Sequence, residues 1–371
     1  MGKKVLALNP GSTSTKIALF EDETQLFSTN LNLDGIDYKS TDGEGNLQKL
    51  FQRVVEEVTK HGYDMGDIDA YAARSGSMNS APAGVYALNE MLLKNCEPYK
   101  GGNVHASYYS PPLAKKLMDT YGGKAFVLNA QEADELDIHA RFTGFFGNWR
   151  KSAIHVLNHK EVGVRTATEI GKKYEDANLI IAHMGGGISV VAHKGGKMVD
   201  YSGSGGEGPM APTRSGTIPC MQVIKMAFSG EYTQQDMLGM TSMTGGLTAH
   251  LGTADAREIE RRIQEGDEYA KLAYDSMIYQ IAKNIGAMAV TLEGKVDAIA
   301  LTGGLSNSKY LVEEIRRQTG WLAPLYVFAG EYEMECLGHS VLRVLNGEEK
   351  SLTYDGHPVF DPEELLKKRK A

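Results

Sequence analysis

One pattern constrains the fold of this chain more than any other, because it occurs three times: a short apolar strand runs directly into a small, polar, glycine-bearing turn. The turns occupy residues 9–16, 183–189 and 302–308. The first two continue into a second apolar strand and predict β-hairpins, whereas the third continues into a helix. Two such hairpins in separate halves of a chain of 371 residues indicate two domains of similar plan, with a boundary near residue 155.

Helical periodicity alternates with these strands, which predicts an α/β protein. Apolar residues at three- and four-residue spacing predict helices over about 46–61, 267–293 and 334–345. A shorter helix is expected to open at Asp255. The charged segment 361–370 predicts a solvated terminal helix rather than an interaction arm.

Charge and cysteine content narrow the functional classes. The 39 basic and 47 acidic residues give a net charge of −8, which leaves no basic excess for binding nucleic acid. Three widely separated cysteines, Cys96, Cys220 and Cys336, indicate neither a disulfide framework nor a Cys-x-x-Cys site. The apolar runs are too short for a secretion signal or a membrane span. We therefore expect a cytoplasmic location and no membrane partner.

Glycine turns after buried strands are typical of phosphate sites, because backbone N–H groups can point into one concavity and small hydroxyl side chains add donors. Segment 9–16 is not a Walker loop, since the second glycine before Lys16 is missing and a strand follows. A single turn of this kind could equally be an ordinary hairpin, but three of them favour ATP. The spacing of Gly203, Gly205 and Gly208 follows no buried strand and predicts a loop rather than a dinucleotide site.

Six segments, in order along the chain, resemble the butyrate kinases within the acetate kinase group. They are Asn9-x-Gly-Ser-x-Ser-x-Lys16, Asn103-Val-His105-Ala-Ser, His155-Val-Leu-Asn-His-Lys, Ala182-His-Met-Gly-Gly-Gly-Ile-Ser189, Glu207-Gly-Pro-Met-Ala-Pro-Thr-Arg-Ser-Gly216 and Leu301-Thr-Gly-Gly304. The resemblance runs from residue 5 to about residue 350 and so covers nearly the whole chain.

The resemblance implies the duplicated ribonuclease-H-like ATPase fold shared with sugar kinases, actin and heat-shock ATPases. Each domain is expected to hold a mixed five-stranded sheet with flanking helices, with a nucleotide cleft between the domains. Residues 1–154 plus about 333–371 would form the acyl-substrate domain, and residues 155–332 the nucleotide-binding domain. The last long helix would pack back on the first domain. Relatives of this kind suggest a homodimer or a higher homo-oligomer.

The implied reaction moves a phosphoryl group from ATP to a short-chain carboxylate, giving an acyl phosphate and ADP, and it runs in either direction. Because a carboxylate needs no general base, cations and hydrogen-bond donors should dominate the site. By resemblance, Arg74 and Arg214 hold the carboxylate and the transferring phosphoryl group, and His155 donates to its equatorial oxygens. Without the resemblance, each arginine could be a surface ion-pair member and each histidine a structural one.

The other site residues are also assigned by matching positions. Asn9 and Asn129 complete the catalytic set, and His105 lies on the substrate side. The nucleotide would be held by Ser12, Ser14, Lys16, His183, Gly185, Gly186, Gly187, Asp255, Ala256, Arg257, Gly304, Leu305 and Ser308. Mg²⁺ is expected on the nucleotide phosphates, with Glu333 as its carboxylate and Glu331 and Glu335 as alternatives. His155 and His159 lie four apart, but no third ligand accompanies them, so zinc is not expected.

The chain departs from the family at residue 129, where Asn stands in place of the Asp expected after the strand near residue 125. Asn keeps the carbonyl oxygen but carries no charge, which would weaken its hold on Mg²⁺. Two hypotheses follow: a working short-chain acyl kinase that prefers butyrate, and a catalytically weak relative that binds nucleotide in a regulatory role. The acyl-chain preference is a family inference, because one methylene changes discrimination by only about 1–3 kcal/mol.

Overall fold

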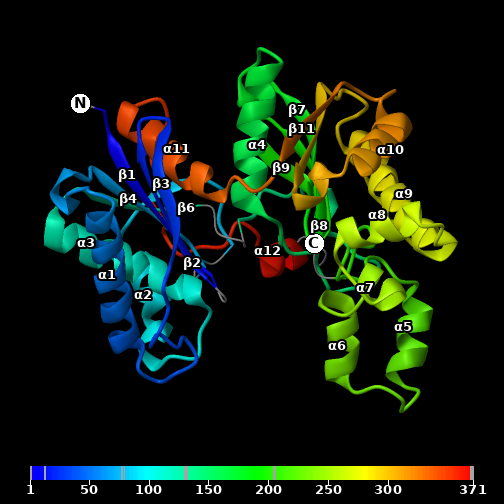
Figure 1. Cartoon of the computed structure of the whole chain (residues 1–371), viewed down its shortest axis with the longest axis horizontal. Coiled ribbons are helices and arrows are strands. Elements are labelled where there is room, and N and C mark those ends of the chain that lie inside the picture. The colour runs from blue at the N-terminus through cyan, green and yellow to red at the C-terminus, as the bar shows by residue number, and fades with distance from the viewer. Residues whose placement is uncertain are drawn as a thin grey trace. The chain divides into compact units, whose positions relative to one another are not determined.

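The computed structural model describes residues 2–11, 14–76, 78, 80–128, 133–203 and 206–367, and the chain divides into two compact units. Unit 1 comprises Met1–Glu135, Phe145–Ser152 and Tyr332–Ala371, and unit 2 comprises Leu136–Gly144 and Ala153–Glu331. Each unit has its own sheet, its own flanking helices and its own hydrophobic core (Figure 1).

Unit 1 is built on a six-stranded mixed sheet in the order β3-β2-β1-β4-β6-β5. Its strands are β1 (Lys4–Pro10), β2 (Thr15–Glu21), β3 (Thr24–Leu31), β4 (Ala70–Arg74), β5 (Val85–Ala87) and β6 (Lys124–Leu128). β1 pairs antiparallel with β2, which confirms the first predicted hairpin, and it pairs parallel with β4. The expectation of five strands was wrong for this sheet, because the short β5 adds to the edge of β6.

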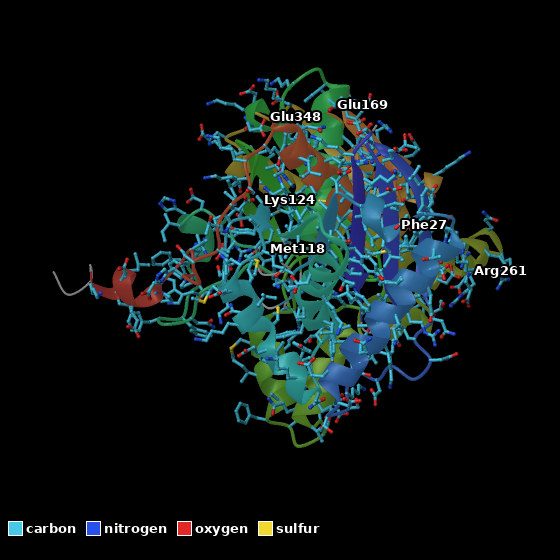
Figure 2. All side chains as sticks on the ribbon, turned by 90° about the vertical axis from the view of Figure 1, so that its left-hand side faces the viewer. Phe27, Met118, Lys124, Glu169, Arg261 and Glu348 are labelled. Carbon is cyan, nitrogen blue, oxygen red and sulfur yellow. The ribbon has the colours of Figure 1, made fainter. Side chains whose placement is uncertain are left out.

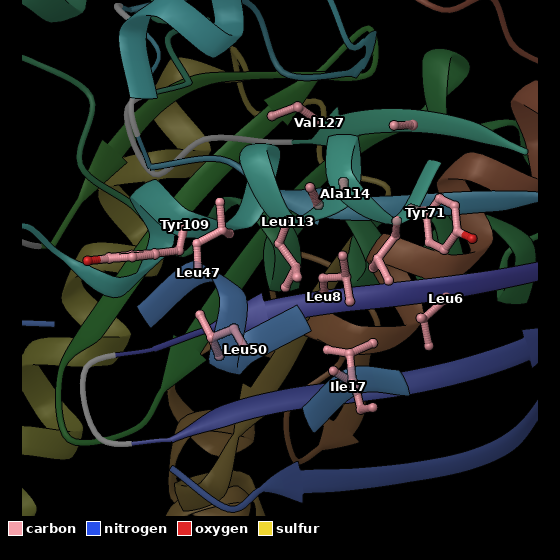
Figure 3. Close-up of a cluster of buried hydrophobic side chains, with 14 of the residues drawn as sticks. Leu6, Leu8, Ile17, Leu47, Leu50, Tyr71, Tyr109, Leu113, Ala114 and Val127 are labelled. Carbon is pink, nitrogen blue, oxygen red and sulfur yellow. The ribbon is translucent and has the colours of Figure 1, made fainter. Parts of the chain in front are cut away.

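Unit 1 has five helices among the described residues, and both faces of its sheet are covered by helices from this set. They are α1 (Gly43–Lys60), α2 (Glu90–Cys96), α3 (Ser110–Tyr121), α11 (Glu333–Asn346) and α12 (Pro362–Lys367), with short 3-10 turns at Met65–Asp67, Glu97–Gly101 and Ala106–Tyr109. Alternate residues of β1 point to opposite faces. Leu6 and Leu8 therefore join a core with Leu50 of α1 and Leu113 of α3, as Figure 3 shows. At the sheet edge, Phe27 of β3, which is labelled in Figure 2, stacks on the imidazole ring of His61 at the end of α1.

The opposite face of the unit 1 sheet is covered by α11, which packs on β1, β2 and β4. The approach is close because Gly338 lies directly against the ring of Phe20, where a Cβ atom would meet the ring at 2.4 Å. Gly347 ends this helix in the left-handed conformation. The prediction that the last long helix packs back on the first domain is therefore confirmed. The terminal helix α12 has no buried residue, as predicted from its charge.

Unit 2 is built on a five-stranded mixed sheet in the order β11-β10-β7-β8-β9. Its strands are β7 (Asn178–Met184), β8 (Ile188–Lys194), β9 (Lys197–Ser202), β10 (Ala298–Gly303) and β11 (Leu325–Ala329). β7 and β8 form the second predicted hairpin, and β10 pairs parallel with both β7 and β11. The loop that starts at Gly203 follows β9, a half-buried edge strand that the sequence pattern did not predict.

Two long helices, α4 (Val156–Glu169) and α9 (Glu268–Thr291), lie on opposite faces of the unit 2 sheet. The other helices of this unit are α5 (Cys220–Ala227), α6 (Gln234–Ser242), α7 (Gly246–Leu251), α8 (Ala256–Gln264) and α10 (Lys309–Thr319), and its 3-10 turns lie at His139–Arg141, Tyr174–Asp176 and Gly304–Asn307. Ile180 and Ala182 of β7 share a core with α9, so the residues between and after them face α4. No helix within the described ranges combines the length and the apolar character that a bilayer crossing demands.

The Gly338 contact predicts opposite effects for two helix substitutions. Gly338→Ala should lower the free energy of unfolding by about 1–2 kcal/mol, because overpacking against Phe20 outweighs the helix propensity gained. Gly286→Ala in α9 is the matched control, since its Cβ would meet nothing within 4 Å, and it should raise stability by up to about 1 kcal/mol. Equilibrium unfolding in urea measures both. A stabilised Gly338→Ala protein would contradict the packing described for α11.

Candidate functional site

Two of the three glycine turns meet at one edge of the unit 2 sheet. β7 and β10 pair in parallel, with His183 opposite Thr302, so the carboxyl ends of both strands lie side by side. The approach requires glycine at the end of β10. Gly303 has φ +87°, and a Cβ atom there would lie 2.4 Å from the carbonyl oxygen of Met184.

A pocket of about 710 Å³ opens at this edge of unit 2. Eight of the residues assigned to the nucleotide by resemblance line it, namely Gly185, Gly186, Asp255, Ala256, Arg257, Gly304, Leu305 and Ser308. The pocket therefore gathers residues from the ends of two strands and the start of α8. Both glycine turns open onto it, which is the arrangement that a phosphate-bearing ligand needs.

Two carboxylates contribute polar groups to the pocket wall. Asp255 caps α8 by accepting the N–H of Arg257, and the Arg257 guanidinium lies 2.8 Å from it. These hydrogen bonds lower the pKa of Asp255 to about 2. Glu260 accepts hydrogen bonds from Ser308 Oγ and, at 3.0 Å, from Tyr274 Oη. Sequence reasoning missed Glu260, although it lies within the helix predicted to open at Asp255.

The guanidinium of Arg214 lies against the glycine turn at residues 183–189. Thr213 donates its N–H and its Oγ hydroxyl to the carbonyl oxygen of Gly186 at 3.1 and 2.9 Å. This anchor brings Arg214 over Gly187, where a Cβ atom would lie 2.4 Å from Cζ of the guanidinium. Glycine at residue 187 therefore leaves the space that Arg214 occupies.

Four histidines gather on the face of the sheet that α4 covers. His155 stands at the N-cap of α4, His159 follows one turn later, His183 belongs to β7 and His193 to β8. The rings of His155 and His183 stack with 4.1 Å between centroids, and His159 lies 5.6 Å from His193. The hydroxyl of Ser189 on β8 lies 3.1 Å from His155 Nδ1 and 2.8 Å from His159 Nε2.

Burial keeps three of these histidines neutral. His159 and His193 are fully buried and His183 is 5% exposed. Desolvation is the main reason why the pKa of each lies well below 6.5, and neighbouring positive charge adds to it, from Arg214 at His183 and from Lys160 at His193. Across the described ranges, no group of three or more His, Cys, Asp or Glu side chains is arranged to hold a metal ion.

In unit 1, a second group forms where β1 and β4 end. These strands are parallel neighbours, which brings Asn9 and Arg74 together. Arg74 donates Nη1–H to Asn9 Oδ1 at 3.0 Å, and Asn9 donates Nδ2–H to Glu333 Oε2 at 2.8 Å. Arg74 Nη1 also lies 3.9 Å from Glu333 Oε2. The fold thus joins three of the predicted site residues, although 324 positions separate Asn9 from Glu333.

His105 is held near this group in unit 1. Its Nδ1 accepts the backbone N–H of Ser107 at 3.2 Å and lies 2.7 Å from Ser107 Oγ. Gly76 lies against the same hydroxyl, where a Cβ atom would meet Ser107 Oγ at 1.7 Å. His105 is therefore positioned beside the segment that follows Arg74 in the chain.

The remaining predicted residues differ in how far the structure describes them. Ser12 and Asn129 lie outside the described residues. Ser14 and Lys16 are exposed in unit 1. Among the described residues assigned to the nucleotide in unit 2, His183 and Gly187 are not part of the pocket lining. The lining also includes Pro212, Asn307 and Glu331, of which only Glu331 had been considered, as an alternative metal ligand.

The three neutral histidines predict how stability depends on pH. An unfolded histidine titrates near pH 6.5, so below that pH the unfolded chain binds protons that these folded histidines refuse. The free energy of unfolding that these histidines contribute is fully present above pH 6.5, and it is lost progressively as the pH falls below 6.5. Well below pH 6.5, each histidine that stays neutral in the folded state adds a slope that approaches about 1.4 kcal/mol per pH unit. Urea unfolding at pH 7, 6 and 5 measures it.

Two variants isolate this contribution. His193→Asn keeps a partner for Tyr174, whose hydroxyl lies 2.7 Å from His193 Nδ1, and it should flatten the slope by about 1.4 kcal/mol per pH unit. Val290→Ala changes an exposed side chain without a titratable group and should leave the slope as it is. Equal slopes for the two variants would contradict the buried neutral state of His193.

Sequence comparison relates this geometry to known proteins. The profile of the Acetokinase family matches residues 130–323. The chain is also 41% identical over 354 residues to a protein named "Probable butyrate kinase 2" from Caldanaerobacter subterraneus subsp. tengcongensis. That match covers 95% of this chain and 99% of the relative.

Solved structures show the same fold. An acetate kinase from Porphyromonas gingivalis matches with a TM-score of 0.72 at 20% identity, covering 90% of this chain and 98% of that one. A propionate kinase from Francisella tularensis subsp. tularensis SCHU S4 matches with a TM-score of 0.72 at 19% identity, covering 91% and 98%. The expected duplicated ATPase fold is thus confirmed. With the family profile and the 41% identical relative, this establishes that the chain belongs to the acetokinase family.

Proposed function

We propose that this chain is a short-chain fatty acid kinase that transfers the γ-phosphoryl group of ATP reversibly to butyrate or a related short or branched carboxylate. The products are an acyl phosphate and ADP. The observation that carries the proposal is the unit 2 pocket, where two glycine turns open together and Arg214 lies on one of them. The name of the 41% identical relative supports butyrate as the acceptor.

The chemistry of this transfer asks for donors and positive charge. A carboxylate oxygen attacks the γ-phosphorus, the bond from that phosphorus to the bridging oxygen breaks, and ADP leaves with the electron pair. Because the attacking carboxylate is already an anion, no side chain has to remove a proton. Catalysis then depends on aligning the reactants and on cancelling charge on the equatorial oxygens.

The residues of unit 2 supply the nucleotide side of this reaction. Backbone N–H groups of the two glycine turns would hold the phosphates, and Asp255 and Glu260 offer acceptors for the hydroxyls of a ribose. The planar donors of Arg214 would hold the transferring phosphoryl group. His155, which stacks on His183 beside Arg214, would donate to the equatorial oxygens.

The residues of unit 1 supply the acyl side. Arg74 is oriented by Asn9 and Glu333, and it would bind the carboxylate of the acyl substrate. His105, held by Ser107, would shape the substrate pocket. The turn at residues 9–16, which includes Ser12, Ser14 and Lys16, would contact the terminal phosphate.

Mg²⁺ carried by the nucleotide is part of the proposal, and Glu333 fits it. Both contacts of this carboxylate use Oε2, so Oε1 would be the donor to the ion or to its waters. Mg²⁺ in kinases keeps several waters and takes only one or two carboxylates, which matches a single Glu. When bound, the ion would neutralise charge that develops on the phosphate oxygens. Asn129 would add a neutral oxygen to its surroundings.

A homo-oligomer in the cytoplasm is also part of the proposal, and exposed apolar side chains support the oligomer. The consecutive helices α5 and α6 form a hairpin (Figure 1) with no buried residue in either helix. The hairpin and its flanks expose Met221, Ile224, Phe228, Leu238 and Met243. Clustered exposed apolar groups of this kind mark protein–protein interfaces, and a second copy of this chain would cover them in a homodimer or a higher homo-oligomer.

Turnover with a panel of carboxylates tests the proposed function. In an ADP-coupled assay with butyrate, isobutyrate, propionate and acetate, we expect a kcat of order 1–100 per second, with the highest kcat/KM for butyrate or isobutyrate. Asn129→Asp in the same assay shows whether the missing charge at residue 129 limits the rate. Turnover on a sugar or on glycerol alone, with none on any carboxylate, would disprove the proposal.

The contact between Gly187 and Arg214 predicts a second kinetic result. Gly187→Ala should lower kcat about 100-fold, because the methyl group displaces the guanidinium that stabilises the transferring group. Thermal stability should change little, since the displaced atoms end a flexible side chain. The control is Gly286→Ala, outside the site, which should keep the kcat of the parent. A Gly187→Ala protein with the kcat of the parent would contradict the proposed role of Arg214 in holding the transferring phosphoryl group.

A further inference from the structure

The sequence presented His155 and His159 as a pair with metal-ligand spacing, and the structure shows a serine between them. The Ser189 hydroxyl reaches His155 Nδ1 at 3.1 Å and His159 Nε2 at 2.8 Å. Ser189 and His159 are fully buried, and α4 packs on the sheet that carries Ser189 (Figure 1). A single buried hydroxyl group therefore contacts two imidazole nitrogens, and its one hydrogen can be donated to only one of them.

With neutral imidazoles, two proton arrangements satisfy both contacts and also give the Ser189 hydroxyl hydrogen an acceptor. If both imidazoles instead donated to Oγ, that buried hydrogen would have no acceptor, because the two imidazole nitrogens are the contacts of Ser189 Oγ within the described residues. In the first, His159 Nε2–H donates to Ser189 Oγ, and the Ser189 hydroxyl donates to His155 Nδ1. In the second, His155 Nδ1–H donates to Ser189 Oγ, and the hydroxyl donates to His159 Nε2. The first arrangement leaves the hydrogen of His155 on Nε2, and the second leaves it on Nδ1.

The other nitrogen of His159 decides between these arrangements. His159 Nδ1 is buried without a hydrogen-bond partner among the described residues. In the second arrangement this atom would carry an N–H with no acceptor, whereas in the first it carries only an unused lone pair. Buried N–H groups without an acceptor are rarer than acceptors that lack a donor. The first arrangement is therefore the favoured one.

We propose that Ser189 and His159 are positioning residues that hold His155 in the tautomer whose hydrogen is on Nε2. The hydrogen on Nε2 then lies on the ring edge that does not face Ser189. The link to catalysis rests on the proposed function, in which His155 donates to the transferring phosphoryl group. The tautomer itself follows from contacts within unit 2 alone.

The surroundings keep this arrangement in place at neutral pH. The groups around the two rings are His183, stacked on His155, His193 beside His159, and the charged Arg214 and Lys160. The histidines at 159, 183 and 193 are neutral for the reasons given above. A neutral His159 carries its hydrogen on one nitrogen only, and the buried Nδ1 without an acceptor makes that nitrogen Nε2.

A similar contact occurs at His105 in unit 1. There Nδ1 accepts a backbone N–H from Ser107, so a neutral His105 also carries its hydrogen on Nε2. Two histidines that the proposed function places at the substrates thus have Nδ1 held by a serine two or more residues away. This recurrence supports the assignment at His155, because it arises from different elements.

Long-range ¹H–¹⁵N NMR on histidine-labelled protein tests the tautomer without any activity measurement. His155→Gln assigns the signal. We expect the parent protein to show His155 protonated at Nε2 and not at Nδ1 near pH 7, and Ser189→Ala to show a mixture of tautomers. His155 protonated at Nδ1 alone in the parent would overturn the proposal, as would an unchanged tautomer in Ser189→Ala.

Matched variants of His159 keep the test decisive if Ser189→Ala folds poorly. The side-chain amide of His159→Gln can replace Nε2–H and should preserve the His155 tautomer, with kcat within about fivefold of the parent. His159→Leu removes the donor and should lower kcat about 10–100-fold, with KM changed less than threefold. Equal kcat values for Gln and Leu would contradict the positioning role.

A third variant separates positioning from damage to the buried cluster. His193→Asn alters the same cluster but contacts Tyr174 rather than Ser189, so it should leave the His155 tautomer and kcat unchanged. If the parent turns over no carboxylate while its NMR spectrum shows the predicted tautomer, the proposed function fails and the hydrogen-bond assignment stands. If the parent turns over a carboxylate while His155 shows the opposite tautomer, the proposed function stands and the hydrogen-bond assignment fails.

Discussion

Parallel pairing of neighbouring strands is the constraint on which both site groups depend. β7 and β10 are parallel in unit 2, and β1 and β4 are parallel in unit 1. Each pair therefore ends at one edge of its sheet, and the turns that follow must share that edge, as ligand sites of open α/β sheets do. Antiparallel pairing of either pair would send the two turns to opposite edges. The pocket in unit 2 and the Asn9–Arg74 contact in unit 1 are thus consequences of topology.

Glycine allows neighbouring strands and side chains to approach each other closely at these sheet edges. The chain has 42 glycines in 371 residues, and several stand where a Cβ atom would collide with a neighbour. Gly303 allows β10 to approach the end of β7, Gly187 leaves room for Arg214, and Gly76 leaves room for Ser107. Gly338 serves packing instead, since it seats α11 on the sheet. At these four positions glycine allows a close approach by backbone or side-chain atoms, which any larger residue would block.

Local patterns allowed the hairpins and long helices to be predicted, because each depends on neighbours in sequence. α1, α9 and α11 differ from their predicted ranges only at the ends. The three-residue strand β5 has no such pattern, so the sixth strand was missed. The Asn9–Arg74–Glu333 group was anticipated by family resemblance, since no local rule joins residues 324 positions apart. The contact of Ser189 with two histidines was not predicted, because it depends on which face of β8 meets α4.

The histidine pair on α4 shows how strand register selects a chemistry. Residues four apart on a helix can converge on a metal ion or on a hydroxyl group, and their spacing does not distinguish the two. In this chain the pairing of β7 with β8 sets Ser189 opposite His183, and both face α4. A shift of one residue would turn Val190 toward the histidines and bury the serine hydroxyl among apolar side chains. The shifted register would lose the hydrogen bonds of the Ser189 hydroxyl to the two imidazoles. It would also lose the packing of Val190 against α9 that the observed register provides. The burial pattern of β8 therefore fixes the group that the two imidazoles meet.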